Sequence, residues 1–526
     1  MRQLLFVNGD VHTMDPRRPR VEAVCVRGDT ITAVGTSRDV LSWKERGDLV
    51  VDLRGRPLIP GFIDAHAHFL SYALGRKRLR LALMGKDMVL KGVTDAARRQ
   101  PRGSWVLGRG WNHHLWAPKV LPHRLELDRV APEHPVSLVS HDGHTIWANT
   151  RAIEAAGIDR MRKDPPGGRI GRDEDGTPSG ILFEHAIELM LARIPPPTPQ
   201  ARRAAVASIV PLTHSLGITS LHVIEDHDSL TTLAEMWRDG ELPLRVAFFV
   251  PVEGWKTTAR NGIQSGFGGD RFRIGGVKIY ADGTLSSRTA AMLEPFSGGR
   301  DRGMLLVPAR EMREVVRDVN ARGLSVMVHA IGDRAVRAAL DAFQGALKHA
   351  QRWDLRNRVE HAEVIAAGDL ARFQRLGVIA SMQPNQIFAD ISTAENLWGR
   401  RRCARAFPLR SLWQSGAIMA FGSDCPVEDL PPLPGIYAAV SRTRMDGTPA
   451  GGWNRQEALT VEEAVWAYTM GGAYASHEED RKGSITPGKS ADLVVLSTDI
   501  FRGSPRRILE AKVDLTLFDG QVVHER

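Results

Sequence analysis

The middle of the chain alternates short apolar segments with amphipathic ones, and this alternation restricts the fold more than any other feature of the sequence. The apolar segments are rich in β-branched and aliphatic side chains, as buried strands are. Near-continuous apolar strands that alternate with helices indicate a parallel sheet covered on both faces. Eight such strands predict an α/β fold, a closed (β/α)8 or TIM-like barrel. The segments are 59–68, 217–224, 244–250, 276–280, 324–329, 358–364, 378–382 and 418–421.

Each end of the chain has a different pattern, in which short apolar runs are divided by turn residues. Near the N-terminus the pairs Asn8-Gly9 and Gly28-Asp29 interrupt such runs, and Asp519-Gly520 does the same near the C-terminus. Glycine-containing pairs between β-branched runs are typical of hairpins. Two β-rich ends around a very different middle predict one small β-sandwich assembled from both termini.

These patterns define the expected domains. We assign residues 1–57 and 481–526 to the β-sandwich and residues 58–480 to the barrel. The segment between the first two strands is far too long for one βα connection, so it predicts an insert at about residues 70–210. Loops at the active face of a barrel carry function, and we expect the insert to cover a site there.

Composition excludes several other classes of protein. The formal net charge is +9, but the basic residues are mostly Arg and are spread along the chain, whereas a nucleic-acid binder concentrates them on one helix or tail. No segment approaches the ~20 consecutive apolar residues of a membrane span. The 3 cysteines, Cys25, Cys403 and Cys425, are too far apart for a disulfide framework or a cysteine-rich zinc module. We therefore expect a cytoplasmic protein whose partner is a small-molecule substrate, neither nucleic acid nor membrane, and we leave a homodimer open.

The run Asp64-Ala65-His66-Ala67-His68 closes the first apolar strand and is the strongest local signal for chemistry. Residues two apart in a strand point to the same side, so His66 and His68 should both face inward at the carboxyl end of the strand. Barrel enzymes carry their active sites at that end. Two convergent neutral imidazoles are half of a metal site, although a pair of hydrogen-bonded core histidines would have the same sequence.

Three later strands also end in side chains that can bind a metal. These are His329, His361 and Asp424, each at the carboxyl end of an apolar strand. Any one of them alone is more easily explained as a structural residue. Burying so many ionisable groups in one barrel mouth is unfavourable unless they bind something, so their joint occurrence favours a metal centre.

Lys278 is an unusual residue for the apolar strand 276–280. A charged ammonium group pointing into a barrel is unfavourable. The side chain could extend outward to solvent, its pKa could be depressed, or its amine could be carbamylated by carbon dioxide into a carboxylate that bridges two metals. The sequence does not choose among these alternatives.

With these positions assembled, the chain resembles the amidohydrolase superfamily, metal-dependent hydrolases built on a (β/α)8 barrel. Within it, the chain is similar to the amidohydrolase-3 group, which includes N-substituted formamide deformylases. The similarity spans nearly the whole chain in the correct order. The segments that carry it are 60–68, 108–111, 142–144, 277–283, 329–333, 358–362, 422–424 and 488–494, together with Asn149.

The resemblance implies a role for each candidate ligand. His66 and His68 would hold the more buried metal, and His329 and His361 would hold the second. Asp424 would ligate the first metal and act as the catalytic proton shuttle.

The resemblance also implies that Lys278 is a carboxylated lysine bridging two divalent metals. Histidine and carboxylate ligands suit zinc best, although manganese or iron would fit the same ligands. Some relatives use another residue as the bridge or bind one metal only. Glu184 is then the competing bridge in this chain.

The chemistry that such a site implies is hydrolysis. A divalent metal lowers the pKa of bound water to about 7, and Asp424 would return the proton to the departing amine. We expect cleavage of a non-peptide C–N bond in an amide, a formamide or a cyclic amide. The alternative with the same fold is deamination of a heterocycle by a single metal. A non-catalytic binding barrel would show damaged ligand positions, and none of the six is damaged.

Substrate contacts are expected from the insert and from one barrel loop. The candidates are Trp111, Asn112, His144 and Arg288. Trp111 could equally pack the core of the insert itself. Arg288 could anchor an anionic group, or it could pair with a loop carboxylate.

Overall fold

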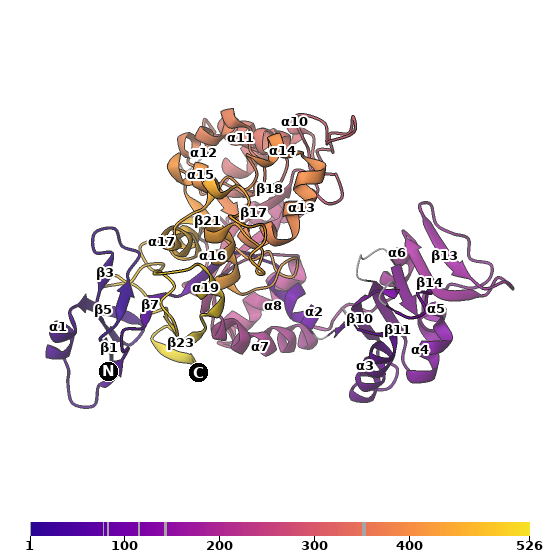
Figure 1. The fold of residues 1–526 in the computed structure, drawn as a ribbon, viewed down its shortest axis with the longest axis horizontal. Coiled ribbons are helices and arrows are strands. Elements are labelled where there is room, and N and C mark those ends of the chain that lie inside the picture. Colours follow the sequence, from indigo (N-terminus) through magenta and orange to yellow (C-terminus); the bar gives the residue numbers. More distant parts are fainter. Residues whose placement is uncertain (1, 77, 82–83, 114–115, 141–144, 350–353) are drawn as a thin grey trace. The chain divides into compact units, whose positions relative to one another are not determined.

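The computed structural model describes residues 2–526 except 77, 82–83, 114–115, 141–144 and 350–353. The chain divides into two compact units (Figure 1). Met1–Ser71 and Val206–Arg526 form the larger unit, and Tyr72–Ala205 form the smaller one, which we call the insert.

Eight parallel strands form the sheet at the centre of the larger unit, in the order β21-β20-β19-β18-β17-β16-β15-β8. Nearly every residue in them is buried, as expected of strands covered on both faces. The sheet closes where the last strand meets the first: the Asp424 N–H donates to the His66 carbonyl at 2.7 Å, and the His68 N–H donates to the Cys425 carbonyl at 2.9 Å. The predicted (β/α)8 barrel is therefore confirmed. Its strands are β8 (Phe62–Ala67), β15 (Ile218–Ile224), β16 (Arg245–Pro251), β17 (Phe272–Tyr280), β18 (Val326–Ala330), β19 (Arg358–His361), β20 (Ile379–Met382) and β21 (Met419–Phe421).

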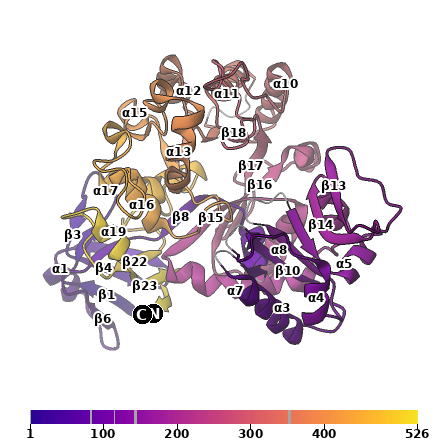
Figure 2. The same ribbon diagram turned by 45° about the vertical axis from the view of Figure 1, so that its right-hand side comes forward.

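Helices lie on the outside of the barrel, as Figure 2 shows for α10, α11 and α12 around β18. In α10 the buried residues Met312, Val316 and Val319 follow the three- and four-residue spacing of one helix face, and this face packs inward. Helix α7 (Pro199–Ser215) leads from the insert into this unit. The helices that follow it, up to the last strands of the chain, are α8 (His227–Arg238), α9 (Trp255–Arg260), α10 (Ala309–Asn320), α11 (Asp333–Ala346), α12 (Leu370–Leu376), α13 (Ile387–Leu397), α14 (Arg400–Cys403), α15 (Leu409–Gln414), α16 (Pro432–Ser441), α17 (Val461–Trp466) and α18 (Gly472–Ala475).

The two ends of the chain share one sheet, and their ribbons lie side by side in both views (Figures 1 and 2). Strand β22 pairs with β7 so that Val494 lies opposite Ile59 and Val495 opposite Leu58. This six-stranded sheet has the order β24-β23-β22-β7-β2-β3, and a four-stranded sheet β5-β4-β1-β6 accompanies it. The strands are β1 (Gln3–Val7), β2 (Asp10–His12), β3 (Arg20–Val21), β4 (Ala23–Arg27), β5 (Thr30–Gly35), β6 (Leu49–Asp52), β7 (Pro57–Pro60), β22 (Leu493–Leu496), β23 (Val513–Phe518) and β24 (Gln521–Glu525), with helices α1 (Ser37–Ser42) and α19 (Arg506–Glu510).

One apolar core joins these two sheets. Phe6 and Val24 from the four-stranded sheet pack in one buried cluster with Leu58, Leu493 and Leu515 from the six-stranded sheet. Neither terminus could bury these side chains alone, so the predicted β-sandwich from both ends is what the structure contains.

The segment 59–68 is not the single strand that its composition predicted. It divides at Pro60-Gly61 into β7, in the terminal sheet, and β8, in the barrel. Proline has no N–H to give to a ladder. The Gly61 N–H donates to the Asp492 carbonyl at 2.8 Å, and a Cβ on Gly61 would lie 2.4 Å from the Thr219 hydroxyl oxygen. A small residue here lets the chain pass from one sheet to the other.

The insert is a sheet with helices of its own. Its strand order is β13-β14-β12-β11-β10-β9, and three buried indoles, Trp111, Trp116 and Trp147, pack in its core with ring centroids 5.8–6.1 Å apart. Its elements are α2 (Phe69–Arg76), which leads into it, β9 (Leu79–Arg80), α3 (Lys86–Arg99), β10 (Val106–Trp111), α4 (Arg124–Val130), β11 (Val136–Ser140), β12 (Thr145–Ala148), α5 (Thr150–Ala155), β13 (Gly168–Arg172), β14 (Pro178–Glu184) and α6 (Ile187–Leu191).

Among the described residues, no helix combines the length and the apolar character that crossing a lipid bilayer requires.

Candidate metal centre

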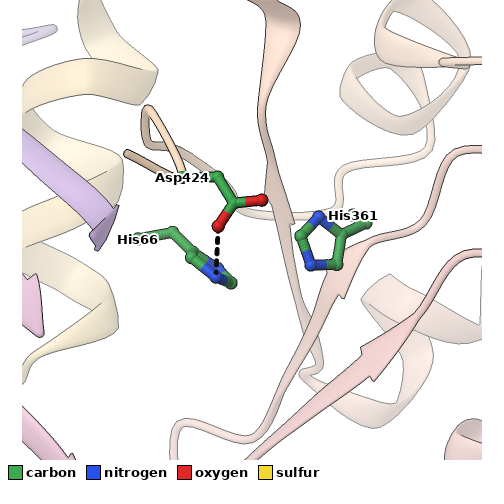
Figure 3. A group of neighbouring side chains, drawn as sticks. All are labelled: His66, His361 and Asp424. Atoms are coloured by element: carbon green, nitrogen blue, oxygen red, sulfur yellow. Dashed lines mark ion pairs between the residues drawn. The ribbon is translucent and has the colours of Figure 1, made fainter. Parts of the chain in front are cut away.

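His66 and His68 both direct their Nε2 atoms at one carboxylate oxygen. The distances to Asp424 Oδ1 are 3.4 Å from His66 and 3.3 Å from His68. Figure 3 shows Asp424 between His66 and His361, with the ion pair to His66 dashed. The carboxyl ends of the first, sixth and eighth barrel strands thus meet, as the sequence predicted for parallel strands.

The other nitrogen of each of these two imidazoles is held by the barrel wall. His66 Nδ1 lies 2.5 Å from Glu360 Oε2, and His68 Nδ1 lies 2.6 Å from the Ile224 carbonyl oxygen. Both partners are acceptors, so both Nδ1 atoms donate and both Nε2 atoms keep a lone pair toward Asp424. Metal-binding histidines are held in this way by carboxylates and carbonyls behind them.

A fully buried arginine supports this carboxylate. Arg358 donates to both oxygens of Glu360, from Nε to Oε1 at 2.8 Å and from Nη2 to Oε2 at 3.2 Å. Its Nη2 also donates to the Ala65 carbonyl at 2.6 Å and to Ser381 Oγ at 3.0 Å. Although burial acts to raise it, the guanidinium holds the pKa of Glu360 below its ordinary value. Glu360 is therefore an anion in the barrel interior.

His329 and His361 continue the cluster. Their ring centroids are 4.4 Å apart, and the His361 ring lies 5.0 Å from that of His66. His361 Nδ1 is buried and has no hydrogen-bond partner among the described residues, whereas His329 Nε2 lies 3.1 Å from the Gly283 carbonyl oxygen. His66, His361 and Asp424 each offer a ligand atom within 4.8 Å of the others.

Three histidines of this cluster, His66, His329 and His361, are held neutral. Burial, and then the nearby Lys278, lower the pKa of His329 to about 4. Burial also lowers the pKa of His66 and of His361 well below the usual 6.5. Neutral imidazole is the form that binds a metal. A convergent set of neutral nitrogens and a carboxylate, with one buried nitrogen left without a partner, fits a divalent cation.

Lys278 points into the barrel, which excludes the outward orientation. It is 2% exposed and lines the same pocket as the histidines. Its Nζ has no hydrogen-bond partner among the described residues and lies 4.8 Å from the centroid of the Tyr280 ring. Burial lowers the pKa of Lys278 to about 8. An amine with this pKa is partly unprotonated at neutral pH, which is the form that reacts with carbon dioxide. Carboxylation itself stays a prediction.

Two further residues orient the ligands and were not among the predicted ones. Gln386 Nε2 donates to Asp424 Oδ2 at 3.1 Å. Asp64 Oδ1 accepts the His66 N–H at 3.1 Å and the Ser423 N–H at 2.9 Å, which ties the ends of β8 and β21 together. Asp64 was visible in the sequence as the first residue of the histidine motif, whereas nothing in the sequence indicated Gln386.

A pocket of about 430 Å³ opens over the cluster. A volume of this size is within the ~300–1,000 Å³ of small-molecule sites. The candidate ligands His66, His68, Lys278, His329, His361 and Asp424 all line it, together with Tyr280, Thr284, Leu285, Ser286, Ile331, Glu363, Gln386, Ala389, Asp390, Thr393, Val427 and Glu428.

The remaining candidates lie elsewhere. Trp111 is 1% exposed in the core of the insert, and its Nε1 donates to the Leu138 carbonyl at 2.8 Å, so it fits the packing alternative rather than a substrate contact. Asn112 follows β10 and is half-buried, and Glu184 ends β14 of the insert and is exposed. His144 lies outside the described residues. Arg288 is exposed on the loop after β17 and is not part of the pocket lining.

Comparison with known proteins agrees with this arrangement. The model of the amidohydrolase family matches residues 49–524. The chain is 31% identical to "Protein LONG AFTER FAR-RED 3" of Arabidopsis thaliana, over 94% of this chain and 87% of that protein. It is 28% identical to the N-substituted formamide deformylase of Arthrobacter pascens, over 100% of this chain and 99% of that protein. The crystal structure of an uncharacterized metal-dependent hydrolase from Pyrococcus furiosus superposes with a TM-score of 0.79 and 27% identity, over 96% of this chain and 100% of that one.

Proposed function

The chain belongs to the amidohydrolase family, and from this premise we propose that it cleaves a non-peptide C–N bond in a small amide, a formamide or a cyclic amide. Its family and its hydrolase relatives make it a metal-dependent hydrolase that acts on C–N bonds. The proposal adds the substrate type and the roles of the residues. One observation carries it: histidines from three strands and Asp424 line one pocket, and ligand atoms of His66, His361 and Asp424 lie within 4.8 Å of one another.

We assign the ligands by their places in this cluster. His66, His68 and Asp424 would hold one divalent ion, because both Nε2 atoms face the same carboxylate oxygen. His329 and His361 would hold the second. Lys278, once carboxylated, would bridge the two. Zinc suits these ligands. A bound divalent metal supplies Lewis acidity and a hydrolytic nucleophile at neutral pH.

Asp424 is the residue placed to move the proton. Gln386 fixes its Oδ2, and its Oδ1 faces the histidines at the base of the pocket. In this orientation the carboxylate can take a proton from the attacking water and deliver it to the nitrogen that leaves. An amine is a poor leaving group without that proton, so a residue in this position suits cleavage of a C–N bond.

The test is hydrolysis by protein of measured metal content. N-formyl, N-acyl and cyclic amides would be offered as substrates, with release of amine or ring opening as the signal. We expect turnover of at least one of these classes, and complete loss of it in Asp424→Asn with the metal retained at reduced affinity. Release of ammonia from a heterocycle by protein with one ion per chain and unmodified Lys278 would instead establish the single-metal deaminase. Turnover that survives Asp424→Asn would contradict the proposed role of this residue.

A further inference from the structure

Carboxylates that serve none of the proposed ligands gather along the pocket. Glu363 follows β19, Asp390 lies on α13, and Glu428 follows β21, and all three line the pocket over the metal centre. The charged groups that act on Glu428 are themselves all carboxylates. Within the described part of the barrel unit, none of the three side chains forms an ion pair. This is unexpected in a chain with a formal net charge of +9.

Two buried acceptors at the same place have no donor within the described part of the chain. Glu363 is only 2% exposed, and its Oε2 has no hydrogen-bond partner among the described residues. Gln386 is 7% exposed, and its amide nitrogen must face the Asp424 carboxylate, so its Oε1 turns away and is also without a described partner. Leaving a buried acceptor unsatisfied destabilises the folded chain. Such acceptors in a pocket wall are suited to a ligand that donates hydrogen bonds.

We propose that the substrate carries a positively charged nitrogen, such as a primary ammonium or a guanidinium group, which Glu363, Asp390 and Glu428 bind while the scissile C–N bond lies at the metal ligands. The inference rests on the proposed function, because it places the reacting bond in the same pocket. Ammonium and guanidinium groups are donors only, which matches a wall of unpaired acceptors.

The electrostatics of the carboxylates support this substrate class. Burial raises the pKa of Asp390 to about 6, and burial together with neighbouring carboxylates raises that of Glu428 to about 7. These shifts reflect anions that lack a counter-charge, and a bound cation would stabilise their ionised forms. A substrate with a carboxylate at this position would meet the same repulsion, so discrimination by charge is expected.

The experiment compares three amides of similar length on the metal-loaded protein. The probes are N-formyl-1,4-diaminobutane, which is cationic, N-formylpentylamine, which is neutral, and N-formyl-4-aminobutanoate, which is anionic. Each is measured for kcat/KM and, by calorimetry, for binding. We expect the cationic probe to exceed the neutral one by on the order of 10- to 100-fold, and the anionic probe to be the poorest.

The variant Asp390→Asn/Glu428→Gln tests the residues. It should lower the ratio of cationic to neutral probe at least about tenfold. The charge-matched control Glu311→Gln/Glu314→Gln, on the exposed face of α10, should leave that ratio unchanged. If the double variant does not fold, Asp390→Asn alone gives the same comparison.

The outcomes separate this inference from the proposed function. Equal or better turnover of the neutral or anionic probe, or a cationic preference that survives in the double variant, would overturn the inference and leave amide hydrolysis standing. If no probe is hydrolysed, the proposed function fails for this class of amide. Calorimetry then decides about the cation site: preferential binding that the double variant loses supports it, and equal binding of the three probes overturns it. Loss of a divalent ion from the double variant, with unchanged discrimination, would assign the carboxylates to a metal and also overturn it.

Discussion

Replacing Glu360 with glutamine should damage both the stability of the barrel and its affinity for metal. Arg358 donates to both oxygens of this carboxylate, from Nε to Oε1 at 2.8 Å and from Nη2 to Oε2 at 3.2 Å, and His66 Nδ1 lies 2.5 Å from Oε2. An amide offers one acceptor oxygen and one NH2 group. In Glu360→Gln at least one of these donors must therefore face another donor, and neither orientation of the amide preserves every contact.

The size of each effect follows from which contact is lost. In either orientation of the amide the fully buried guanidinium of Arg358 loses its counter-charge, and breaking a buried pair in this way costs about 3–5 kcal/mol. If the NH2 group faces His66, the imidazole must accept at Nδ1, and its proton moves to Nε2, the nitrogen that faces Asp424. Loss of the carboxylate behind a metal-binding histidine lowers metal affinity about 10- to 100-fold.

The assay is a double-mutant cycle with two measurements on each protein. Urea-induced unfolding gives the change in unfolding free energy, and competition with a chromophoric chelator gives the metal affinity. Arg358→Met alone should also be destabilising, because it leaves Glu360 as an unpaired buried anion. In Arg358→Met/Glu360→Gln both charges are gone and the amide oxygen is free to face His66. The double variant should therefore be more stable than the sum of the single effects by about 2 kcal/mol or more.

Glu311→Gln on α10 is the matched control, since it changes the same functional group at an exposed position. It should alter neither measurement. Wild-type metal affinity in Glu360→Gln, or single effects that add without coupling, would refute the view that this carboxylate both orients His66 and neutralises Arg358.

Three further outcomes are expected. His66→Ala/His68→Ala should abolish metal binding and hydrolysis while the far-ultraviolet circular dichroism stays unchanged. Retained hydrolysis in this double variant would contradict the proposed mechanism. Lys278→Ala should lose at least one metal equivalent by elemental analysis, with partial recovery on adding short-chain carboxylic acids, whereas full metal content would remove Lys278 from the ligand set. In the metal-free folded protein the pKa of His329 is about 4, whereas in the unfolded chain it is about 6.5. Between these two pH values the unfolded chain therefore binds one more proton at this residue than the folded chain does. The free energy of unfolding should thus have its full value above pH ~6.5 and fall by up to about 3 kcal/mol as the pH drops toward ~4. The variant His329→Asn should show a weaker pH dependence of this free energy in urea titrations.

The barrel and its histidines were predictable because both depend on local patterns. Buried parallel strands are apolar throughout, so they stand out from the amphipathic helices between them. The carboxyl ends of all such strands lie at one face of the barrel. Polar residues at these ends are therefore close to one another, independently of the conformation of the loops. His66, His329 and Asp424 were found by this argument, and the structure brings them to one pocket. The break at Pro60-Gly61 was missed because the segment stays apolar on both sides of it.

The carboxylate behind His66 could not be assigned from the sequence, and the reason is conformational. Strand alternation puts Glu360 and His361 on opposite faces of β19, so a prediction that turns His361 inward turns Glu360 outward. In the structure His361 and the following Ala362 have φ of 69° and 44°, a left-handed backbone that non-glycine residues seldom adopt. This turn ends the alternation and lets both side chains reach the site. Asp424, with φ of 60°, is turned in the same way at the end of β21.

Such backbone costs about 1–3 kcal/mol per residue and persists only where the surroundings fix it. At His361 and Asp424 the surroundings are visible. The Ala362 N–H donates to the Ala330 carbonyl at 3.1 Å, and the Asp424 N–H donates to the His66 carbonyl at 2.7 Å, so each turn is held by a neighbouring strand of the barrel. The two ligands that depart from alternation are thus positioned by pairing between strands far apart in sequence. No pattern within one strand contains that information, whereas the closed barrel imposes it on both residues at once.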